Sequence, residues 1–561
     1  MTARLTDTPR PDTPRPEPRH RLRGFVRDED GSMMIFVLSL VVIMLMVGGM
    51  AVDLMRREQR ETLLQQTGDR AALAAAKLTQ TLQPTAVVQD YFDKAGLSQY
   101  LTGVHVDEGV NYRTVQVDAE ATLKPFFMQM MGIDELRVPA ASTAEQRITN
   151  VEIMLVLDVS GSMNEATQGT TKIAALRTAA KEFVNTVKER DVENRITVTI
   201  VPYNAQVNLG LTLRSQYNAT NLHGVANVDC LEVPTSMFSA TGISRTTAIP
   251  MMAYADTTSS TPLSGSYTNW TSTAGSGARI NTGQPFCRNN AANIVRLPSI
   301  NPTTIKANID GLVAAGNTSI TLGMKWGVAL LDPGARSMYT TLINTGQIPS
   351  QASGRPYAWD DTDSMKVIIL MTDGEHVSHT RVNDAYKTGI SPIYRSTGDG
   401  NYSIHHTANR PATALLNEYY VPHLGTWQAT PYNSGGGVTQ MNWQDVWANQ
   451  RVSWVAQQLY ARALGTDAAT QTSWYNSTRT AMQSTWASVP AMDSTLQQSC
   501  TLAKNNGVVV YGIAFEAPTN GQAQILACAS SPAHYFNAQG LSISTAFRAI
   551  ASNISQLRLT Q

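Results

Sequence analysis

The chain has 561 residues, with 43 basic and 43 acidic side chains and therefore a formal net charge of zero. This length exceeds that of one ordinary domain and allows more than one hydrophobic core. The balanced charge argues against nucleic-acid binding, which normally requires a strongly basic domain. Charged residues make up only 15% of the chain, below the roughly 25% of an average soluble protein. A neutral polar composition of this kind suits an exported protein.

The N-terminal region predicts a membrane anchor. Residues 1–32 begin with a stretch rich in arginine and proline, which predicts a disordered tail. Residues 33–52 carry no charge and are long enough to cross a bilayer core as a helix. A cleaved signal peptide would have a shorter apolar region and a small-residue cleavage site. The arginines before the span favour a cytoplasmic N-terminus. We therefore expect a single pass through the inner (cytoplasmic) membrane and a periplasmic or extracellular body.

Two elements are predicted between the span and the large C-terminal region. Residues 53–83 are rich in Leu, Ala, Gln, Glu and Arg, which predicts that the membrane helix continues outward as a stalk up to Pro84. Residues 84–147 predict a small α/β module. It begins with a short helix closed by Gly96, and residues 111–123 alternate as a half-buried strand does.

The segment from the DEDG sequence to the Ala-rich run resembles the N-terminal region of TadE/TadG-like proteins, which assemble the Flp (tight-adherence, Tad) pilus. The similar features are the acidic-Gly start, the apolar span, the Ala-Val-Asp exit at 51–53 and the DRAALAAA run within 66–76. Processed pseudopilins of that system carry Glu at the fifth position after the cleaved glycine. Here Phe36 is the fifth residue after Gly31, so we expect the span to be retained. The resemblance implies a pilin-like anchor and a role beside other Tad pilus components.

From residue 148 to 561 the pattern becomes that of an α/β domain. Uninterrupted apolar runs predict strands that are buried on both faces, at 151–157, 195–203, 366–374 and 508–515. Helical periodicity is found at 171–190, 301–316 and 542–559. Strands that alternate with helices predict a doubly wound, mostly parallel sheet. Two stretches, at about 207–300 and 376–492, are too long for ordinary loops and are interpreted as large insertions at the edges of the sheet.

The four cysteines all follow the membrane span. They are Cys230, Cys287, Cys500 and Cys528. An even number in an exported body fits two disulfides, and free buried thiols are the alternative. Three pairings are possible, of which 230–287 and 500–528 are favoured because each closes the more local loop.

Polar residues with metal-binding chemistry follow the predicted strands, where ligands gather in an open α/β sheet. Asp158 ends the first strand and starts a D-x-S-x-S sequence with Ser160 and Ser162, while Asp373 ends a later strand. Between them, Thr318 lies in a polar loop that opens a helix. Two carboxylates and three hydroxyls suit a hard divalent cation. Mg²⁺ is the first choice, with Mn²⁺ and Ca²⁺ as alternatives.

This arrangement resembles the metal-ion-dependent adhesion site of von Willebrand factor A domains. The D-x-S-x-S motif, the later threonine and the T-D-G aspartate occur in the family's order. The resemblance implies that Ser160, Ser162 and Thr318 bind the metal directly and that Asp158 and Asp373 act mainly through waters. It also implies a protein partner whose Asp or Glu completes the coordination.

Catalysis is the less favoured interpretation of these motifs. The serines lack the G-x-S-x-G elbow of a hydrolase nucleophile, so no catalytic residue is predicted. Four histidines of the second insertion could form a zinc cluster in an extracytoplasmic hydrolase, although an HExxH motif is missing; unconnected surface histidines are the alternative. These histidines are His376, His379, His405 and His406.

The sequence therefore predicts a metal-dependent binding protein for pilus assembly or a minor pilus-associated component. A surface adhesin without a role in pilus assembly is the second hypothesis.

Overall fold

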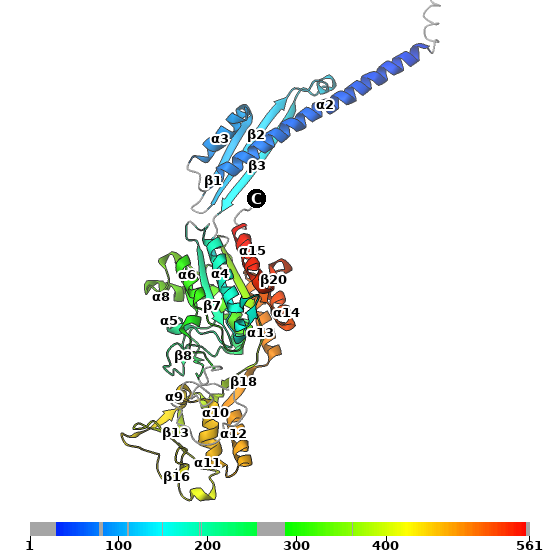
Figure 1. Ribbon diagram of the computed structural model, residues 1–561. Coiled ribbons are helices and arrows are strands. Elements are labelled where there is room, and N and C mark those ends of the chain that lie inside the picture. The colour runs from blue at the N-terminus through cyan, green and yellow to red at the C-terminus, as the bar shows by residue number, and fades with distance from the viewer. Residues whose placement is uncertain are drawn as a thin grey trace, which may run out of the picture. The chain divides into compact units, whose positions relative to one another are not determined.

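The chain forms two compact units, which comprise residues up to 148 and residues 149–558 (Figure 1). The computed structural model describes residues 30–556 apart from 78–81, 109–111, 148–149, 190, 192, 255–285 and 362. Most of the predicted disordered tail, residues 1–29, lies outside the described residues.

The first unit begins with one long helix, α2 (Asp30–Ala75). From Met33 onward this helix is long and apolar enough to cross a membrane, which fits a single-pass anchor. It ends at Ala75, although the sequence predicted a helix up to residue 83. The guanidinium group of Arg113 donates hydrogen bonds to the carbonyl oxygens of Ala75 (3.5 Å) and Lys77 (2.9 Å). This side chain takes up carbonyl groups that another helical turn would have paired, and it therefore caps the helix.

The C-terminal half of α2 packs on a small antiparallel sheet with the strand order β1-β2-β3. The strands are β1 (Leu101–Glu108), β2 (Tyr112–Leu123) and β3 (Leu136–Arg147). Helix α3 (Pro84–Lys94) packs beside α2 and against β1. Small alanines of α2 at positions 71, 72 and 75, and Ala76 directly after the helix, lie in the core of this unit, which lets the helix approach the sheet closely. The predicted short helix and alternating strand correspond to α3 and β2, and the structure adds β1 and β3 to this module.

The second unit is built on a six-stranded sheet with the order β10-β7-β4-β11-β19-β20. Its strands are β4 (Asn150–Asp158), β7 (Ile196–Tyr203), β10 (Arg296–Ser299), β11 (Ser364–Thr372), β19 (Val509–Phe515) and β20 (Tyr535–Ala538). Strand β10 is antiparallel to β7, and the other neighbours are parallel. The parallel register places the carboxyl ends of β4 and β11 side by side.

Helices cover both faces of this sheet. One face carries α4 (Lys172–Glu189), α6 (Pro302–Asp310) and α15 (Ile543–Gln556). The other carries α7 (Ile320–Leu331), α8 (Arg336–Asn344), α13 (Val489–Asn505) and α14 (Thr519–Cys528). Within β4, Ile153 and Leu155 belong to the first layer, whereas Met154 and Val156 belong to the second. Because both faces are buried, the strand sequence is an uninterrupted apolar run. The mixed α/β fold expected from the sequence is confirmed.

The stretches between β7 and β10 and between β11 and α13 pack together. The first contains α5 (Gly210–Arg214), β8 (Ala219–Thr220) and β9 (Ile249–Pro250). The second contains a five-stranded antiparallel sheet, with the order β16-β15-β14-β13-β17, and several short helices. Its elements are β12 (His379–Val382), β13 (Ile390–Ser396), β14 (Tyr402–His405), β15 (Tyr419–Val421), β16 (Thr426–Gln428), β17 (Val438–Asn442), α9 (Trp443–Asn449), α10 (Val452–Trp454), α11 (Arg462–Leu464), α12 (Ala468–Met482) and β18 (Gln483–Ala487). One apolar cluster contains side chains from both stretches, including Cys230, Met252, Trp447 and Trp454.

The cysteines form two disulfides, Cys230–Cys287 and Cys500–Cys528. The second disulfide joins α13 to α14 beside the main sheet. The first lies in the core that the two inserted stretches share.

Candidate metal centre

The sequence-predicted residues lie together at the carboxyl end of the main sheet. Asp158 is the last residue of β4, and Ser160 and Ser162 lie in the turn that follows it. Asp373 follows β11, the neighbouring parallel strand, and Thr318 lies in the loop before α7. Leu157 of β4 pairs with Met371 of β11, so the two strands end at the same level of the sheet.

Three of these side chains are in direct contact. The hydroxyl of Ser162 donates to Oδ1 of Asp373 at 2.8 Å, and that of Ser160 reaches the same oxygen at 3.4 Å. The two hydroxyl oxygens are 3.1 Å apart. The carboxylate from one strand and the hydroxyls from the next therefore converge on one point.

Thr318 borders the same cluster. Its side chain is buried, and a Cβ atom added to Gly374 would lie 3.2 Å from the Thr318 hydroxyl oxygen. The backbone N–H of Gly161 donates to the carbonyl of Gly316 at 2.8 Å, which ties the serine loop to the threonine loop. A side chain at Gly161 or at Gly374 would press on the threonine loop. The lack of a side chain at these two positions therefore allows the loops to approach closely.

Asp158 lies behind the hydroxyls and holds their loop in place. It is fully buried. One carboxylate oxygen accepts the backbone N–H of Ser160 at 2.8 Å, and the other accepts the hydroxyl of Thr372 at 2.7 Å. Burial raises the pKa of Asp158 to about 7, and repulsion from Asp373 adds to the effect. An ionised Asp158 is therefore costly unless positive charge lies close by.

Lys172, the first residue of α4, provides one positive charge that the sequence analysis missed. Its ammonium group lies 3.2 Å from Oδ2 of Asp373 and 2.8 Å from Oε2 of Glu165. Burial lowers the pKa of Lys172, but the two carboxylates more than offset this, so its pKa is raised. Burial also raises the pKa of Asp373, whereas Ser162 and Lys172 act in the opposite direction. A lysine at a helix N-terminus is unfavourable because it opposes the helix dipole. Its position at the start of the predicted helix therefore indicated that Lys172 has an acidic partner.

The donor set fits a hard divalent cation. All five side chains offer oxygen, and two of them are buried carboxylates whose mutual repulsion a cation would relieve. Lys172 neutralises only one oxygen of Asp373 and does not contact Asp158 among the ion pairs of the described residues. No cluster of three or more His, Cys, Asp or Glu side chains occurs in the part of the chain that the structure describes. The carboxylate and hydroxyl group is thus the candidate metal centre.

The histidines of the second insertion have separate partners. Nδ1 of His376 is 2.7 Å from the carboxylate of Asp493, and Nε2 accepts the backbone N–H of Thr321 at 2.9 Å. His376 therefore caps the N-terminus of α7 directly after the Thr318 loop. His379 contacts Gln206, His405 contacts Glu418, and His406 contacts the Leu459 carbonyl. His376, His379 and His406 are buried, so the interpretation of these three as surface histidines was wrong, and they form no zinc cluster.

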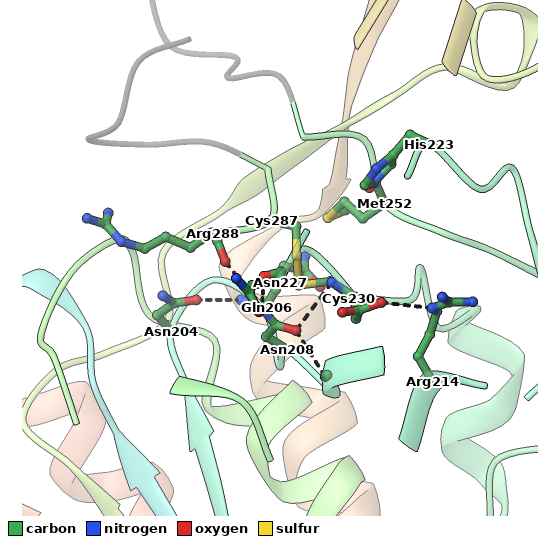
Figure 2. Close-up of a disulfide and its surroundings, with 12 residues drawn as sticks. Asn204, Gln206, Asn208, Arg214, His223, Asn227, Cys230, Met252, Cys287 and Arg288 are labelled. Carbon is green, nitrogen blue, oxygen red and sulfur yellow. Dashed lines mark hydrogen bonds and ion pairs between the residues drawn. A yellow bond between two sulfur atoms is a disulfide. The ribbon is translucent and has the colours of Figure 1, made fainter. Parts of the chain in front are cut away.

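A polar network connects the loop of Thr318 with the first disulfide, and Figure 2 shows the part of this network around the disulfide. Asn204, which follows β7, donates to the Ala315 carbonyl at 3.0 Å, and its own carbonyl accepts the N–H of Ser319 at 2.8 Å. Its side-chain oxygen also accepts the N–H of Gln206 at 3.1 Å. Two residues further on, Asn208 donates to the Arg288 carbonyl at 3.3 Å, beside Cys287. The Cys230–Cys287 region thus supports the segment that holds the threonine loop.

Two family models match parts of the chain. The model described as "Putative Flp pilus-assembly TadE/G-like" matches residues 31–78, and the model of the von Willebrand factor type A domain matches residues 153–245. The second match includes Asp158, Ser160 and Ser162, while Thr318 and Asp373 lie beyond it. Both resemblances seen in the sequence are confirmed: the chain joins a TadE/G-like segment to a von Willebrand factor type A domain. No curated protein matches the chain in sequence.

Several solved structures share a low similarity with the chain. The pilus adhesin SpaC from Lactobacillus rhamnosus GG is 12% identical with a TM-score of 0.28, and the match covers 80% of this chain and 34% of that one. The von Willebrand factor domain of the type V pili tip protein Mfa5 from Porphyromonas gingivalis is 11% identical with a TM-score of 0.30, at coverages of 74% and 98%. The minor pilin PilB from Streptococcus sanguinis is 12% identical with a TM-score of 0.29, at coverages of 82% and 78%. This chain spans about a third of the matched SpaC chain. Scores this low carry no argument about function.

Proposed function

We propose that this protein is a membrane-anchored, metal-dependent protein-binding factor that acts in Flp (Tad) pilus assembly or at the pilus. The observation that carries the proposal is the convergence of the Ser160 and Ser162 hydroxyls on Asp373, with Asp158 buried behind them. The TadE/G-like segment in the same chain supports the pilus context.

Each residue of the centre has a separate task in this proposal. Asp158 orients the serine loop through the Ser160 N–H and is fixed by Thr372. Ser160, Ser162 and Thr318 offer neutral oxygens, and Mg²⁺ is the cation that suits them best, ahead of Mn²⁺ and Ca²⁺. A cation held mainly by neutral oxygens keeps its attraction for anions, so an Asp or Glu of a partner protein can complete its coordination. Lys172 neutralises Asp373 when the cation is absent.

The proposed role is adhesive and not catalytic. Two facing hydroxyls beside two carboxylates can hold a cation, but no histidine among the hydrogen-bond partners of Ser160 and Ser162 could activate a serine. We place the protein in the inner membrane with a cytoplasmic N-terminus, because the arginines before the span follow the positive-inside rule. The von Willebrand factor type A domain then lies in the periplasm or outside the cell.

A capture experiment tests metal-dependent binding. The detergent-solubilised full chain is used to capture proteins from envelope extracts of the source cells in Mg²⁺ and in EDTA. We expect Tad pilus components to bind in Mg²⁺ and to be lost in EDTA. The Ser160→Ala/Ser162→Ala double variant should lose them in both buffers. A Ser239→Ala variant, at an exposed serine of the same unit, should bind as the unaltered chain does. Capture that is indifferent to EDTA and to the double variant would contradict the metal-dependent role.

Deletion of the gene tests the pilus context separately. The proposal predicts cells without Flp pili, which electron microscopy of the deletion strain can show. Complementation with the unaltered gene should restore piliation, and complementation with the double serine variant should not. Normal piliation of the deletion strain would exclude a role in assembly and would leave a surface adhesin as the explanation of the metal centre.

A further inference from the structure

An apolar loop of the first unit is exposed next to the membrane helix. The loop, residues 125–133 (PFFMQMMGI), connects β2 and β3. Phe126 and Met130 are 66% and 73% exposed, and three further apolar side chains are also exposed: Phe127, Met131 and Ile133. Five large apolar side chains within eight residues are more than a soluble surface normally shows, and such a patch marks an interaction site.

The loop is held at the end of the apolar span. The carboxylate of Asp53 accepts the backbone N–H groups of Phe126, Phe127 and Met128 at 2.9, 2.7 and 2.9 Å. Asp53 directly follows the uncharged residues 33–52. The position of the loop along α2 is therefore set by the residue that ends the membrane-spanning sequence.

Phe127 reaches further toward the membrane. A Cβ atom added to Gly49 would lie only 2.2 Å from the Phe127 ring, so the ring packs directly on the helix backbone at that glycine. Gly49 precedes Asp53 by four residues, which at a helical rise of about 1.5 Å per residue corresponds to about 6 Å along the helix. Amphipathic elements at a membrane surface bury their apolar side to a depth of about 5–10 Å. The loop thus lies at interfacial depth.

The backbone of the loop is suited to an apolar environment, where unpaired N–H groups are strongly disfavoured. Besides the three N–H groups that Asp53 accepts, three more are paired inside the loop. Met130 donates to the Phe127 carbonyl, Gly132 to that of Gln129 and Ile133 to that of Met128, each at 3.1 Å. Six backbone N–H groups of the loop are therefore already paired within the protein, which lowers the cost of moving the loop out of water.

The charges beside the loop match lipid head groups. The guanidinium of Arg56 lies over the Phe126 ring, 4.1 Å from its centroid, and forms an ion pair with Asp53. Arg57 and Arg60 follow on the same helix. Arginines and aromatic rings at the end of a span are typical of the membrane–water interface, where the arginines meet lipid phosphates.

We propose that the loop 125–133 inserts into the lipid leaflet on the side of the first unit and forms a second membrane contact beside α2. The inference rests on the proposed membrane span. The occupant is lipid, since the loop continues the apolar surface of the span and Arg56 lies over one of its rings; the exposed Asp134 and Glu135 follow the loop and mark the end of its apolar surface. The helix and the loop then form two membrane contacts that together fix the orientation of the first unit on the bilayer. Asp53 and Gly49 hold the loop against the helix.

Site-directed fluorescence tests this contact. All four native cysteines are in disulfides, so a cysteine introduced by Met130→Cys can be labelled selectively with an environment-sensitive dye. The labelled full chain is reconstituted into vesicles of phosphatidylethanolamine and phosphatidylglycerol, with or without lipid brominated near the head-group end of its acyl chains. We expect a blue-shifted emission and bromine quenching at Met130 that is at least as strong as that at mid-span, because these bromine atoms lie near the depth of the loop.

Two labelled positions serve as controls. A dye at Ile43→Cys, in the middle of the span, reports whether α2 enters the bilayer. A dye at His105→Cys should show no quenching. His105 pairs with Gln116, and Gln116 pairs with Thr143 on β3. The residue next to Thr143 is Ser142, whose hydroxyl donates to Asp69. Asp69 is 16 residues beyond Asp53 along α2, about 24 Å at 1.5 Å per residue.

The outcomes separate this inference from the proposed anchoring. Quenching at Ile43 and at Met130, but not at His105, supports the inserted loop. If the dye at Ile43 is quenched but the dye at Met130 is quenched no more than the dye at His105, the loop does not contact lipid. The membrane span is then still supported. A blue-shifted Met130 dye that bromine does not quench also overturns it, because the loop then lies against protein. Absence of quenching at Ile43 refutes the membrane span and this inference with it.

Discussion

The substitution Asp158→Asn separates the two roles that the structure gives to this carboxylate. Asparagine has the same shape and still accepts the Ser160 N–H through its oxygen. The Thr372 hydroxyl, which now donates to Asp158, can accept from the new amide and donate to the Gly374 carbonyl, 3.4 Å away. The substitution therefore removes the charge and preserves the loop. We expect a variant that is more stable than the unaltered chain without metal, and that no longer responds to metal.

The magnitude follows from the burial of Asp158. Its pKa is raised from 3.8 to about 7, a difference of about 3 pKa units, and each unit corresponds to about 1.36 kcal/mol. Ionised Asp158 thus lowers the free energy of unfolding by up to about 4 kcal/mol. A raised carboxyl pKa leaves stability intact below the unfolded-state pKa and lowers it as pH rises through the folded-state pKa. The advantage of the variant should be absent near pH 4 and complete above about pH 7.

Metal should narrow the difference between the two proteins. A ligand that binds only the native state raises the free energy of unfolding by about 2.7 kcal/mol at 100 times its Kd. The unaltered chain should gain this amount in Mg²⁺, and Asp158→Asn should gain nothing. All nine tryptophans lie between residues 270 and 486, so tryptophan fluorescence during urea unfolding of the solubilised chain reports on the second unit alone.

Asp373→Asn is the matched control, because Asp373 pairs with the buried ammonium of Lys172. Lys172 keeps Glu165 as a second partner at 2.8 Å, so the variant does not leave its ammonium group unpaired. Burial raises the pKa of Asp373 as well, while Lys172 opposes this effect, so Asp373→Asn should gain less stability in EDTA than Asp158→Asn does. Equal stability of Asp158→Asn and the unaltered chain in EDTA at about pH 8 would refute the charge argument. A full response of Asp158→Asn to Mg²⁺ would refute the placement of Asp158 in the metal centre.

Other predictions concern the support of the centre. Gly323→Ala in α7 would place a Cβ 2.5 Å from the buried Tyr203 ring, so we expect a loss of about 1–3 kcal/mol in urea unfolding despite the better helix propensity. Replacing Cys500 and Cys528 by serine opens a 28-residue loop and should lower the free energy of unfolding by about 4 kcal/mol; an unchanged midpoint would contradict the disulfide. Burial lowers the pKa of His379 from 6.5 to about 3, so the unfolded chain binds the proton more tightly. Stability is complete above about pH 6.5 and falls as pH decreases toward 3, and His379→Gln should flatten this acid limb of the unfolding profile.

Local pattern was sufficient to locate the donors of the metal centre. The apolar runs that end in Asp158 and Asp373 predict buried parallel strands, and parallel strands bring their carboxyl ends to one edge. For the charged side chains that support the centre, the apolar pattern predicted no partner. Lys172 belongs to a helix whose periodicity is ordinary, and its pairing with Asp373 spans 201 positions. The loop residue His376 contacts Asp493, which is 117 positions away on α13.

The inserted stretches show the same limit on a larger scale. Their composition indicated insertions but gave no strand order, because short strands and aromatic side chains without a clear period do not specify their partners. The structure brings residues such as Cys230 and Met252 into one core with Trp447 and Trp454. The core thus depends on contacts between two stretches that the chain keeps far apart.

The sequence by itself determined that the chain has an apolar span, a TadE/G-like start, a von Willebrand factor type A pattern and five oxygen donors in the right order. These properties depend on local composition and on short motifs. The periodicity of apolar residues and the spacing of the motif residues are therefore sufficient to recognise them. Only the tertiary structure decided which charges neutralise the donors, and that the PFFMQMM loop lies against the end of the span. Asp53 and the N–H groups it accepts are 73 to 75 positions apart, and contacts of that range arise from strand pairing and helix packing that the local pattern does not encode.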